Sequence, residues 1–267
     1  MEEAPASTVP VEATVAGMRI VVHRRNIEEE ETVEPNFFDA DFTIAASTGS
    51  LMWEGSWACI EQLRQPESWL SQRLRGAKVV ELGSGIGLLG LCAAAVGASV
   101  LLTDVPSVVT STLSDNVAAN HRDALVLAPP PTTSPAGSHR WEDAGSVGAG
   151  SAAAQPLDWT VPLAQQTAPH DPREADVVLA AECVWLRDLV PPFVQTVCAL
   201  LSSPRRPRCV MAFRERATAQ STTFSSAREV LGAFTEAGCE VVALGDYDAP
   251  ESRGLLTGFY EIRWASG

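Results

Sequence analysis

Short apolar runs alternate with amphipathic segments along most of this chain. From Lys78 onward the apolar runs are as long as typical strands, and they cover residues 78–82, 99–103, 124–128, 175–181, 207–213, 239–245 and 256–264. Segments with helical periodicity lie between them, near residues 86–97, 107–120, 188–202 and 224–237. Strands that alternate with helices predict an α/β fold, in which helices cover both faces of a mainly parallel sheet.

Local signals support two of these helix boundaries and the direction of the last strand. Gly97 is suited to end the first helix, and Pro106 is suited to begin the second. The last two strands are separated only by the loop DAPESRG at 248–254, which is too short for a helical crossover. These strands are therefore predicted to pair antiparallel, so that the final strand runs against the rest of the sheet.

The chain before the first of these strands has a different pattern. Residues 1–13 are rich in polar residues and are predicted to be disordered, whereas Met18–Arg25 has the composition of a strand. The acidic run Glu28–Glu31 is interpreted as a solvated loop. Four apolar residues then fall at helical spacing: Trp53, Trp57, Ile60 and Leu63. We expect residues 14–75 to form a β/helix extension that packs on the core.

Length and composition bound the domain organisation. The chain has 267 residues, of which 46% are hydrophobic, and this suits one α/β domain at residues 76–267. Residues 129–154 are rich in Pro, Ser, Ala and Gly, and they are predicted to be a flexible insertion without regular structure.

Charge and cysteine content indicate the partners and the compartment. The formal net charge of -14 argues against nucleic-acid binding and is compatible with a basic protein partner. The six cysteines form no CxxC pair, so we expect reduced thiols in the cytoplasm or nucleus rather than a metal site. No signal peptide or membrane span is visible, and nothing indicates more than a monomer.

A glycine-rich motif carries the clearest functional signal. The segment VVELGSGIGLLG runs from Val79 to Gly90, and the next apolar run, SVLLTD, ends at Asp104. Glycines let the backbone approach a ligand closely, and a carboxylate at the tip of the second strand can accept hydrogen bonds from ribose hydroxyls. This layout is typical of a site for an adenosine-containing cofactor.

The motif can be read in two frames. Gly85, Gly87 and Gly90 satisfy GxGxxG, the dinucleotide pattern, whereas Glu81, Gly83, Gly85 and Gly87 satisfy ExGxGxG, the S-adenosylmethionine pattern. The late position of the motif, the reversed final strand and the preceding tryptophan-bearing segment all favour S-adenosylmethionine. A nicotinamide or flavin cofactor, or a turn that binds no ligand, remains an alternative.

Further motifs lie before and after the glycine motif. They are TGSLMWEGSWACIEQL at 48–63, NVAAN at 116–120, PLDW at 156–159 and ADVVLAAECVWLRDLVPPFVQTVCALL at 175–201. Together with residues 79–104, this order resembles methyltransferase family 16 of the seven-β-strand methyltransferases, whose characterised members are mostly protein-lysine methyltransferases. The resemblance covers roughly residues 40–264, apart from the insertion. It implies a Rossmann-like seven-stranded sheet, S-adenosyl-L-methionine as cofactor, and methyl transfer to a lysine of a partner protein.

The resemblance also implies roles for single residues around the cofactor. Glu81 would brace the glycine turn, Trp53 would lie against the methionine portion, and Trp159 would lie beside the adenine, where a stacked ring excludes water. The expected cofactor-binding residues are Trp53, Glu81, Gly83, Gly85, Gly87, Asp104, Trp159 and Ala181.

Glu182 and Trp185, in the segment AAECVW, are the expected catalytic residues. They follow a predicted strand, at the sheet edge where open α/β folds bind their ligands. An acid can orient a substrate amine, and a tryptophan face can hold an ammonium by cation–π attraction. The family usually has aspartate and tyrosine here, so the acid is one methylene longer and the aromatic residue lacks a hydroxyl. Methylation of arginine, histidine or a small amine, and a non-catalytic binding module, remain open hypotheses.

Overall fold

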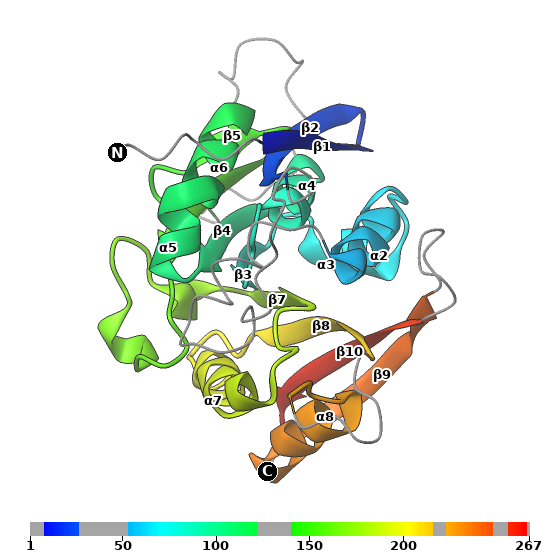
Figure 1. Cartoon of the computed structure of the whole chain (residues 1–267), viewed down its shortest axis with the longest axis vertical. Helices are drawn as coiled ribbons and strands as arrows, with labels where there is room; N and C mark the ends of the chain where they lie inside the picture. Colours follow the sequence, from blue (N-terminus) through cyan, green and yellow to red (C-terminus); the bar gives the residue numbers. More distant parts are fainter. Residues whose placement is uncertain (1–7, 27–52, 122–139, 216–222, 248–255, 266–267) are drawn as a thin grey trace.

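The computed structural model describes residues 8–26, 53–121, 140–215, 223–247 and 256–265. At its centre lies a sheet of eight strands. These are β3 (Lys78–Leu82), β4 (Ser99–Asp104), β5 (Gly145–Val147), β6 (Gly150–Pro156), β7 (Val177–Ala181), β8 (Arg208–Arg214), β9 (Cys239–Tyr247) and β10 (Thr257–Trp264). Their order across the sheet is β5-β6-β4-β3-β7-β8-β10-β9 (Figure 1).

The middle of the sheet is parallel, and two strands, β5 and β10, run in the opposite direction. β6, β4, β3, β7 and β8 pair in parallel, and β10 lies antiparallel between β8 and β9. Every residue of β3 and of β7 is buried, which explains why β7 is a continuous apolar run in the sequence. β3 also buries two charged residues, Lys78 and Glu81. The predicted parallel sheet and the predicted antiparallel pairing of the last two strands are both confirmed.

Helices cover both faces of the sheet (Figure 1). They are α2 (Glu54–Leu63), α3 (Trp69–Leu74), α4 (Leu88–Ala95), α5 (Pro106–Val108), α6 (Ser114–Asn120), α7 (Val190–Leu201) and α8 (Ala227–Glu236). A π-helical turn at Val109–Leu113 interrupts the predicted helix at 107–120, between α5 and α6. Gly97, with φ +113°, follows the end of α4, and Pro106 begins α5, as predicted.

Two hydrophobic cores lie on opposite faces of the sheet, because successive strand residues point to opposite sides. Val79 belongs to a core formed with α2, α3, α4 and the N-terminal hairpin, which we call the hairpin-side core. Val80 belongs to a core formed with α7 and α8, the α7–α8 core. The hairpin-side core contains Cys59 and Cys92, and the α7–α8 core contains Cys209 and Cys239. All six cysteines are thiols, and burial raises the pKa of each one.

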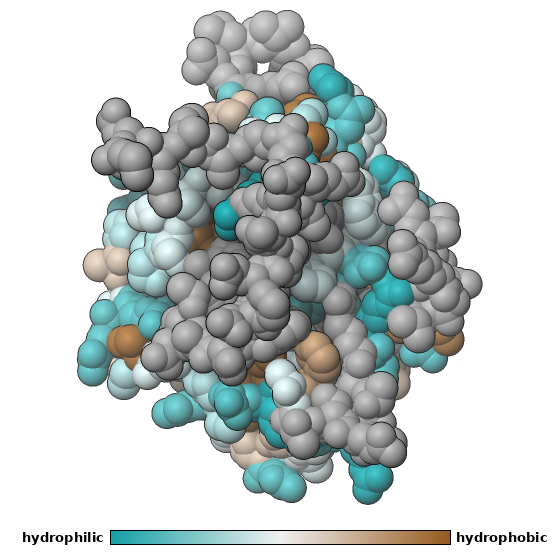
Figure 2. All heavy atoms as spheres, in the orientation of Figure 1, coloured by the Kyte–Doolittle hydropathy of each residue, from teal (hydrophilic) through white to brown (hydrophobic). Residues whose placement is uncertain are grey.

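The chain has 33 acidic and 19 basic residues, which makes its formal charge negative. Figure 2 shows hydrophilic residues over most of the described part of one face, with apolar residues scattered among them. α7 is the longest described helix, and no described helix has both the length and the apolar character needed to cross a membrane.

The N-terminal hairpin corrects part of the prediction of disorder for residues 1–13, of which residues 1–7 lie outside the described residues. β1 (Thr8–Val15) and β2 (Met18–Arg25) pair antiparallel along their full length, so residues 8–13 are strand. In β1 every second residue is at least partly buried, and Ala13 and Val15 belong to the hairpin-side core. The polar residues that suggested disorder occupy the exposed positions in between. The loop predicted at Glu28–Glu31 lies outside the described residues.

Two asparagines of α6 hold the outer edge of β2. Asn116 accepts a hydrogen bond from the His23 amide at 2.8 Å, and its Nδ2 donates to the His23 carbonyl at 3.0 Å and to the Ile86 carbonyl at 2.9 Å. One helical turn later, Asn120 bonds to both backbone groups of Val21. The two side chains therefore replace a neighbouring strand, which explains the spacing of the NVAAN segment.

Asn116→Ala is expected to lower the free energy of unfolding by about 2–3 kcal/mol, because it leaves three backbone groups without their side-chain partner. Urea unfolding followed by circular dichroism measures the change. Thr110→Ala, at an exposed site on the same helical segment, is the control, with an expected change within about 0.5 kcal/mol. A loss for Asn116→Ala no larger than that of the control would contradict the anchoring role.

β5 and β6 correct the prediction for the insertion at 129–154. β5 lies within the last ten residues of this insertion, and β6 begins there and ends at Pro156. The two strands form a hairpin, and β6 pairs with β4 from Ser99↔Ser151 to Asp104↔Pro156. Small residues are needed here because β6 passes close to the end of α4. A Cβ on Gly150 would fall on the carbonyl oxygens of Ala94 and Ala98. The Gly, Ser and Ala content therefore reflects close packing. The strand predicted at 124–128 lies outside the described residues.

Candidate active site

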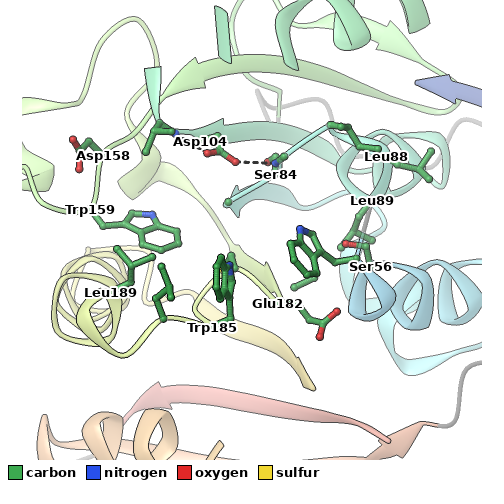
Figure 3. A pocket seen from close by; sticks show the side chains of 18 of the residues that line it. Ser56, Ser84, Leu88, Leu89, Asp104, Asp158, Trp159, Glu182, Trp185 and Leu189 are labelled. Carbon is green, nitrogen blue, oxygen red and sulfur yellow. Dashed lines mark hydrogen bonds between the residues drawn. The ribbon is translucent and has the colours of Figure 1, made fainter. Parts of the chain in front are cut away.

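A pocket lies at the carboxyl ends of β3, β4 and β7 (Figure 3). Its empty space is about 930 Å³, part of it open to solvent. Eight of the ten predicted site residues line it: Trp53, Gly83, Gly85, Asp104, Trp159, Ala181, Glu182 and Trp185. Glu81 and Gly87 do not line the pocket and lie behind it.

Asp104 and the glycine turn form one end of the pocket. The Asp104 Oδ2 accepts a hydrogen bond from the Gly85 amide at 2.8 Å, and its Oδ1 accepts one from the Val105 amide at 2.8 Å (Figure 3). Gly83 has φ +66°, a conformation that side chains other than glycine rarely adopt. A Cβ on Gly83 would also collide with the Cβ of Cys183 on the neighbouring loop. The turn is thus held in place by Asp104 and packed against the end of β7.

Glu81 and Gly87 support the turn from behind. Glu81 is only 3% exposed, and its Oε2 has no hydrogen-bond partner among the described residues. Gly87, with φ +86°, is the N-cap of α4, and a Cβ there would lie 2.7 Å from the Leu113 side chain. Both residues therefore shape the start of α4 without reaching the pocket surface.

Ser84 is a pocket residue that the sequence patterns did not single out. Its hydroxyl accepts a hydrogen bond from the Thr103 amide at 3.0 Å, and its own amide donates to the Thr103 carbonyl at 2.9 Å. Ser84 thus extends the pairing of β3 with β4 by one residue into the turn. The available signal was its position between two glycines, where a small polar residue can bond to the adjacent strand.

The two buried carboxyl groups of the turn make stability depend on pH. Burial raises the pKa of Glu81 from 4.5 to about 8 and that of Asp104 from 3.8 to about 6. Between the unfolded and folded pKa values the folded protein binds protons that the unfolded chain has already released. The free energy of unfolding should therefore fall as the pH rises from about 4 to about 8.

Glu81→Gln is expected to remove the larger part of this decrease in the free energy of unfolding with pH, because glutamine keeps the size of the side chain and does not titrate. The slope for one proton is about 1.4 kcal/mol per pH unit. Urea unfolding of both proteins at a series of pH values gives the profile. The two stabilities should diverge progressively from about pH 4.5 to about pH 8, and parallel profiles would refute the assignment to Glu81.

Aromatic side chains line the rest of the pocket. Trp159 lies near Asp104 and packs edge-on against Phe193, with ring centroids 5.0 Å apart. Trp53 and Trp185 lie at the opposite end, with centroids 6.1 Å apart, and Phe224 continues this row beyond Trp185 at 5.9 Å. Phe224 was not predicted as a site residue, because the sequence pattern placed it at the start of the helix predicted at 224–237, whereas α8 begins only at Ala227. The pocket is therefore apolar at both ends, with polar groups along the glycine turn.

Glu182 is held by an unexpected contact. Its Oε2 accepts a hydrogen bond at 2.5 Å from the amide of Gly55, in the first turn of α2. Its own amide donates to the Ala212 carbonyl at 2.9 Å, and its φ of +52° lies in the left-handed region, which is unusual for a residue with a side chain. Glu182 is 5% exposed, so the carboxylate is both fixed and shielded at the pocket edge.

Ser56 and Gly55 were also missed as site residues. Ser56 lines the pocket next to Trp53, and Gly55 lies behind it against Glu182. The one signal in the sequence was a glycine in the first turn of an otherwise good helix, where glycine lowers helix propensity.

The comparison with protein families agrees with this geometry. The chain matches the model of a family described as lysine methyltransferase over residues 38–128 and 143–230, which is more than half of its length. The matched residues include every predicted site residue.

Individual relatives match shorter parts of the chain. Protein N-lysine methyltransferase METTL21A of Mus musculus is 32% identical over 130 residues, which cover 49% of this chain and 47% of the relative. Protein-lysine N-methyltransferase EFM6 of Saccharomyces cerevisiae is 27% identical over 171 residues, which cover 58% of each. The chain thus spans about half the length of the curated relatives it matches.

The fold also has a solved counterpart. An O-methyltransferase family protein from Burkholderia thailandensis superposes with a TM-score of 0.50 at 12% identity, covering 84% of this chain and 59% of that one. This likeness concerns the fold alone, and it confirms the predicted Rossmann-like methyltransferase sheet. The sheet has eight strands where seven were predicted, because the short strand β5 adds to its edge. On the match to its family model, the chain belongs to the lysine methyltransferase family.

Proposed function

We propose that the protein transfers a methyl group from S-adenosyl-L-methionine to a lysine side chain of a partner protein. The observation that carries the proposal is the composition of the pocket. A glycine turn, a strand-end carboxylate, aromatic walls and a buried acid come from separate segments of the chain and meet at one edge of the sheet. Membership of the lysine methyltransferase family supports the choice of cofactor and of substrate.

The residues present fit S-adenosyl-L-methionine. Each Asp104 oxygen accepts one amide hydrogen bond and keeps a lone pair that can accept from a ribose hydroxyl. Trp159, at the same end of the pocket, offers a face for the adenine, and Gly83 and Gly85 let the backbone lie beside the ligand. We propose that Trp53 covers the methionine end and that Ala181 completes the wall.

The other end of the pocket is proposed to hold the lysine. When bound, S-adenosyl-L-methionine supplies an activated methyl group that passes to an attacking nitrogen by in-line displacement. The Glu182 carboxylate would orient the amine and stabilise its developing positive charge, and the face of Trp185 would attract the ammonium. Lysine must lose a proton first, since its ordinary pKa is about 10.4, and the apolar rings of Trp53 and Trp185 favour the neutral amine by excluding water.

The acidic composition supports a basic partner, because opposite charge speeds encounter. We propose that the enzyme acts as a monomer in the cytoplasm or nucleus, where its buried thiols would stay reduced.

Two measurements test the proposal in sequence. Calorimetric titration with S-adenosylmethionine, S-adenosylhomocysteine and NAD should show binding of the first two and none of NAD. Incubation of the protein with a cell lysate and a donor carrying a labelled methyl group should then label one or a few proteins. Hydrolysis of those proteins to amino acids should place the label on methyl-lysine.

Each other outcome has a definite meaning. NAD binding would establish the dinucleotide frame of the glycine motif. Label on arginine or histidine would retain methyl transfer and replace the substrate. Cofactor binding without any transfer would favour the non-catalytic binding module.

A further inference from the structure

The N-terminus of α2 is capped by a residue from the other side of the pocket. The N-cap residue is Trp53, whose side chain has no acceptor to offer the first amides of the helix. The acceptor is the carboxylate of Glu182, which accepts a hydrogen bond from the Gly55 amide. Gly55 and Glu182 are 127 residues apart in the sequence. A carboxylate suits this place, because the amides at a helix N-terminus carry partial positive charge.

Gly55 has no room for a side chain. A Cβ built on it would lie 2.5 Å from Cγ and 3.0 Å from Cδ of Glu182. The helix backbone therefore lies directly against the glutamate side chain. The glutamate has little freedom to move away, because its backbone is bonded to β8 and its side chain is buried.

This contact joins the two parts of the substrate end. Gly55 belongs to the helix that begins next to Trp53, and Glu182 belongs to the loop that carries Trp185. The two tryptophan rings pack against each other at this end of the pocket, with centroids 6.1 Å apart. The neighbouring residue Glu54 also pairs with Arg214 at the end of β8, with the charged atoms 3.1 Å apart, so the first turn of α2 is tied to two strands.

We propose that Gly55 is a positioning residue for methyl transfer. The Gly55 amide fixes one carboxylate oxygen of Glu182. Because Gly55 has no side chain, there is room for a glutamate at position 182. The two residues form a size-matched pair, in which an aspartate at 182 would tolerate an alanine at 55. The inference rests on the proposed function, since it assigns Gly55 a role in orienting the acid that faces the lysine.

Four proteins test the pair: the wild type, Gly55→Ala, Glu182→Asp and Gly55→Ala/Glu182→Asp. The rate of methyl transfer to lysate proteins is measured at saturating S-adenosylmethionine, and the affinity for this cofactor is measured by calorimetry. Gly55→Ala should lower the transfer rate by roughly tenfold or more, because a displacement of about 1 Å disrupts alignment. The cofactor affinity should stay within about threefold, because Asp104 and the glycine turn are untouched.

Rescue separates positioning from a general structural effect. The double variant should transfer faster than Gly55→Ala, although each single change alone slows the reaction. Gly232→Ala is the matched control, because Gly232 also lies in a helix and a Cβ there would meet nothing within 4 Å. This control should keep the wild-type rate.

Several results would overturn the inference. Wild-type transfer by Gly55→Ala would show that the contact is not needed, and a double variant no faster than Gly55→Ala would show that the residues are not size-matched. If Gly55→Ala fails to fold, the double variant decides, since it should fold and transfer. Absence of lysine methylation by the wild type would instead refute the proposed function, and this inference with it.

Discussion

Asp104→Ala is expected to lower the affinity for S-adenosylmethionine by about two to three orders of magnitude, equivalent to about 3–4 kcal/mol. The variant loses two charge-assisted hydrogen bonds to the ribose hydroxyls. It also releases the Gly85 and Val105 amides, which the carboxylate fixes at 2.8 Å in the structure. Isothermal titration calorimetry of the variant and the wild type measures the change.

Asp176→Ala provides the matched control. The Asp176 carboxylate also accepts a backbone amide, from Lys78 at 2.9 Å, but it lies at the opposite edge of the sheet. Its replacement should lower stability and leave the cofactor affinity unchanged. Equal losses of affinity in both variants would mean that the Asp104 effect is general destabilisation and that its carboxylate does not contact the cofactor.

Glu182→Gln is expected to reduce methyl transfer by roughly a hundredfold while cofactor binding stays intact. Glutamine has the length of glutamate, and its amide oxygen can still accept the bond from Gly55. What it lacks is the negative charge that would stabilise the developing methylammonium. Transfer of labelled methyl groups to lysate proteins and calorimetry with S-adenosylmethionine together measure the two effects.

Glu61→Gln controls for loss of an acid on the same helix. Glu61 is partly exposed and pairs with Arg64 outside the pocket, so its neutralisation should change the transfer rate by no more than about threefold. If Glu182→Gln transferred methyl groups at the wild-type rate, the negative charge of Glu182 would have no part in the reaction. Glu182 would then only cap the helix.

The sequence predicts the centre of this fold well and its edges poorly. β3 and β7 are covered on both faces, so β7 is wholly apolar and β3 has an apolar centre, and the signal is strong. β1 is half-exposed and contains proline, and β6 is built from small residues because it passes close to α4. Their compositions resemble those of disordered segments. Burial on both faces leaves a clear pattern in a sequence, whereas close backbone packing does not.

The same distinction applies to the pocket. Asp104 and the glycine turn lie within 26 consecutive residues, at the ends of two adjacent parallel strands. The pairing of these strands brings them together, so the sequence motif was enough to identify them. The contact between Gly55 and Glu182 joins residues 127 positions apart. It depends on how α2 sits above the ends of β7 and β8, which is a matter of packing between layers. A glycine at position 55 does not by itself predict a glutamate at position 182, and the glutamate does not predict the glycine.

The distribution of cysteines over the two cores provides a built-in probe of local opening. A thiol reagent attacks only the thiolate, and burial suppresses the thiolate of Cys59 and Cys92 on one face and of Cys209 on the other. Modification of the native protein must therefore wait for the corresponding helical layer to detach. Mass spectrometry of pulse-labelled peptides would give a separate opening free energy for each face of the sheet. Comparing the protein with and without cofactor would show which helical layer opens more readily in the absence of cofactor.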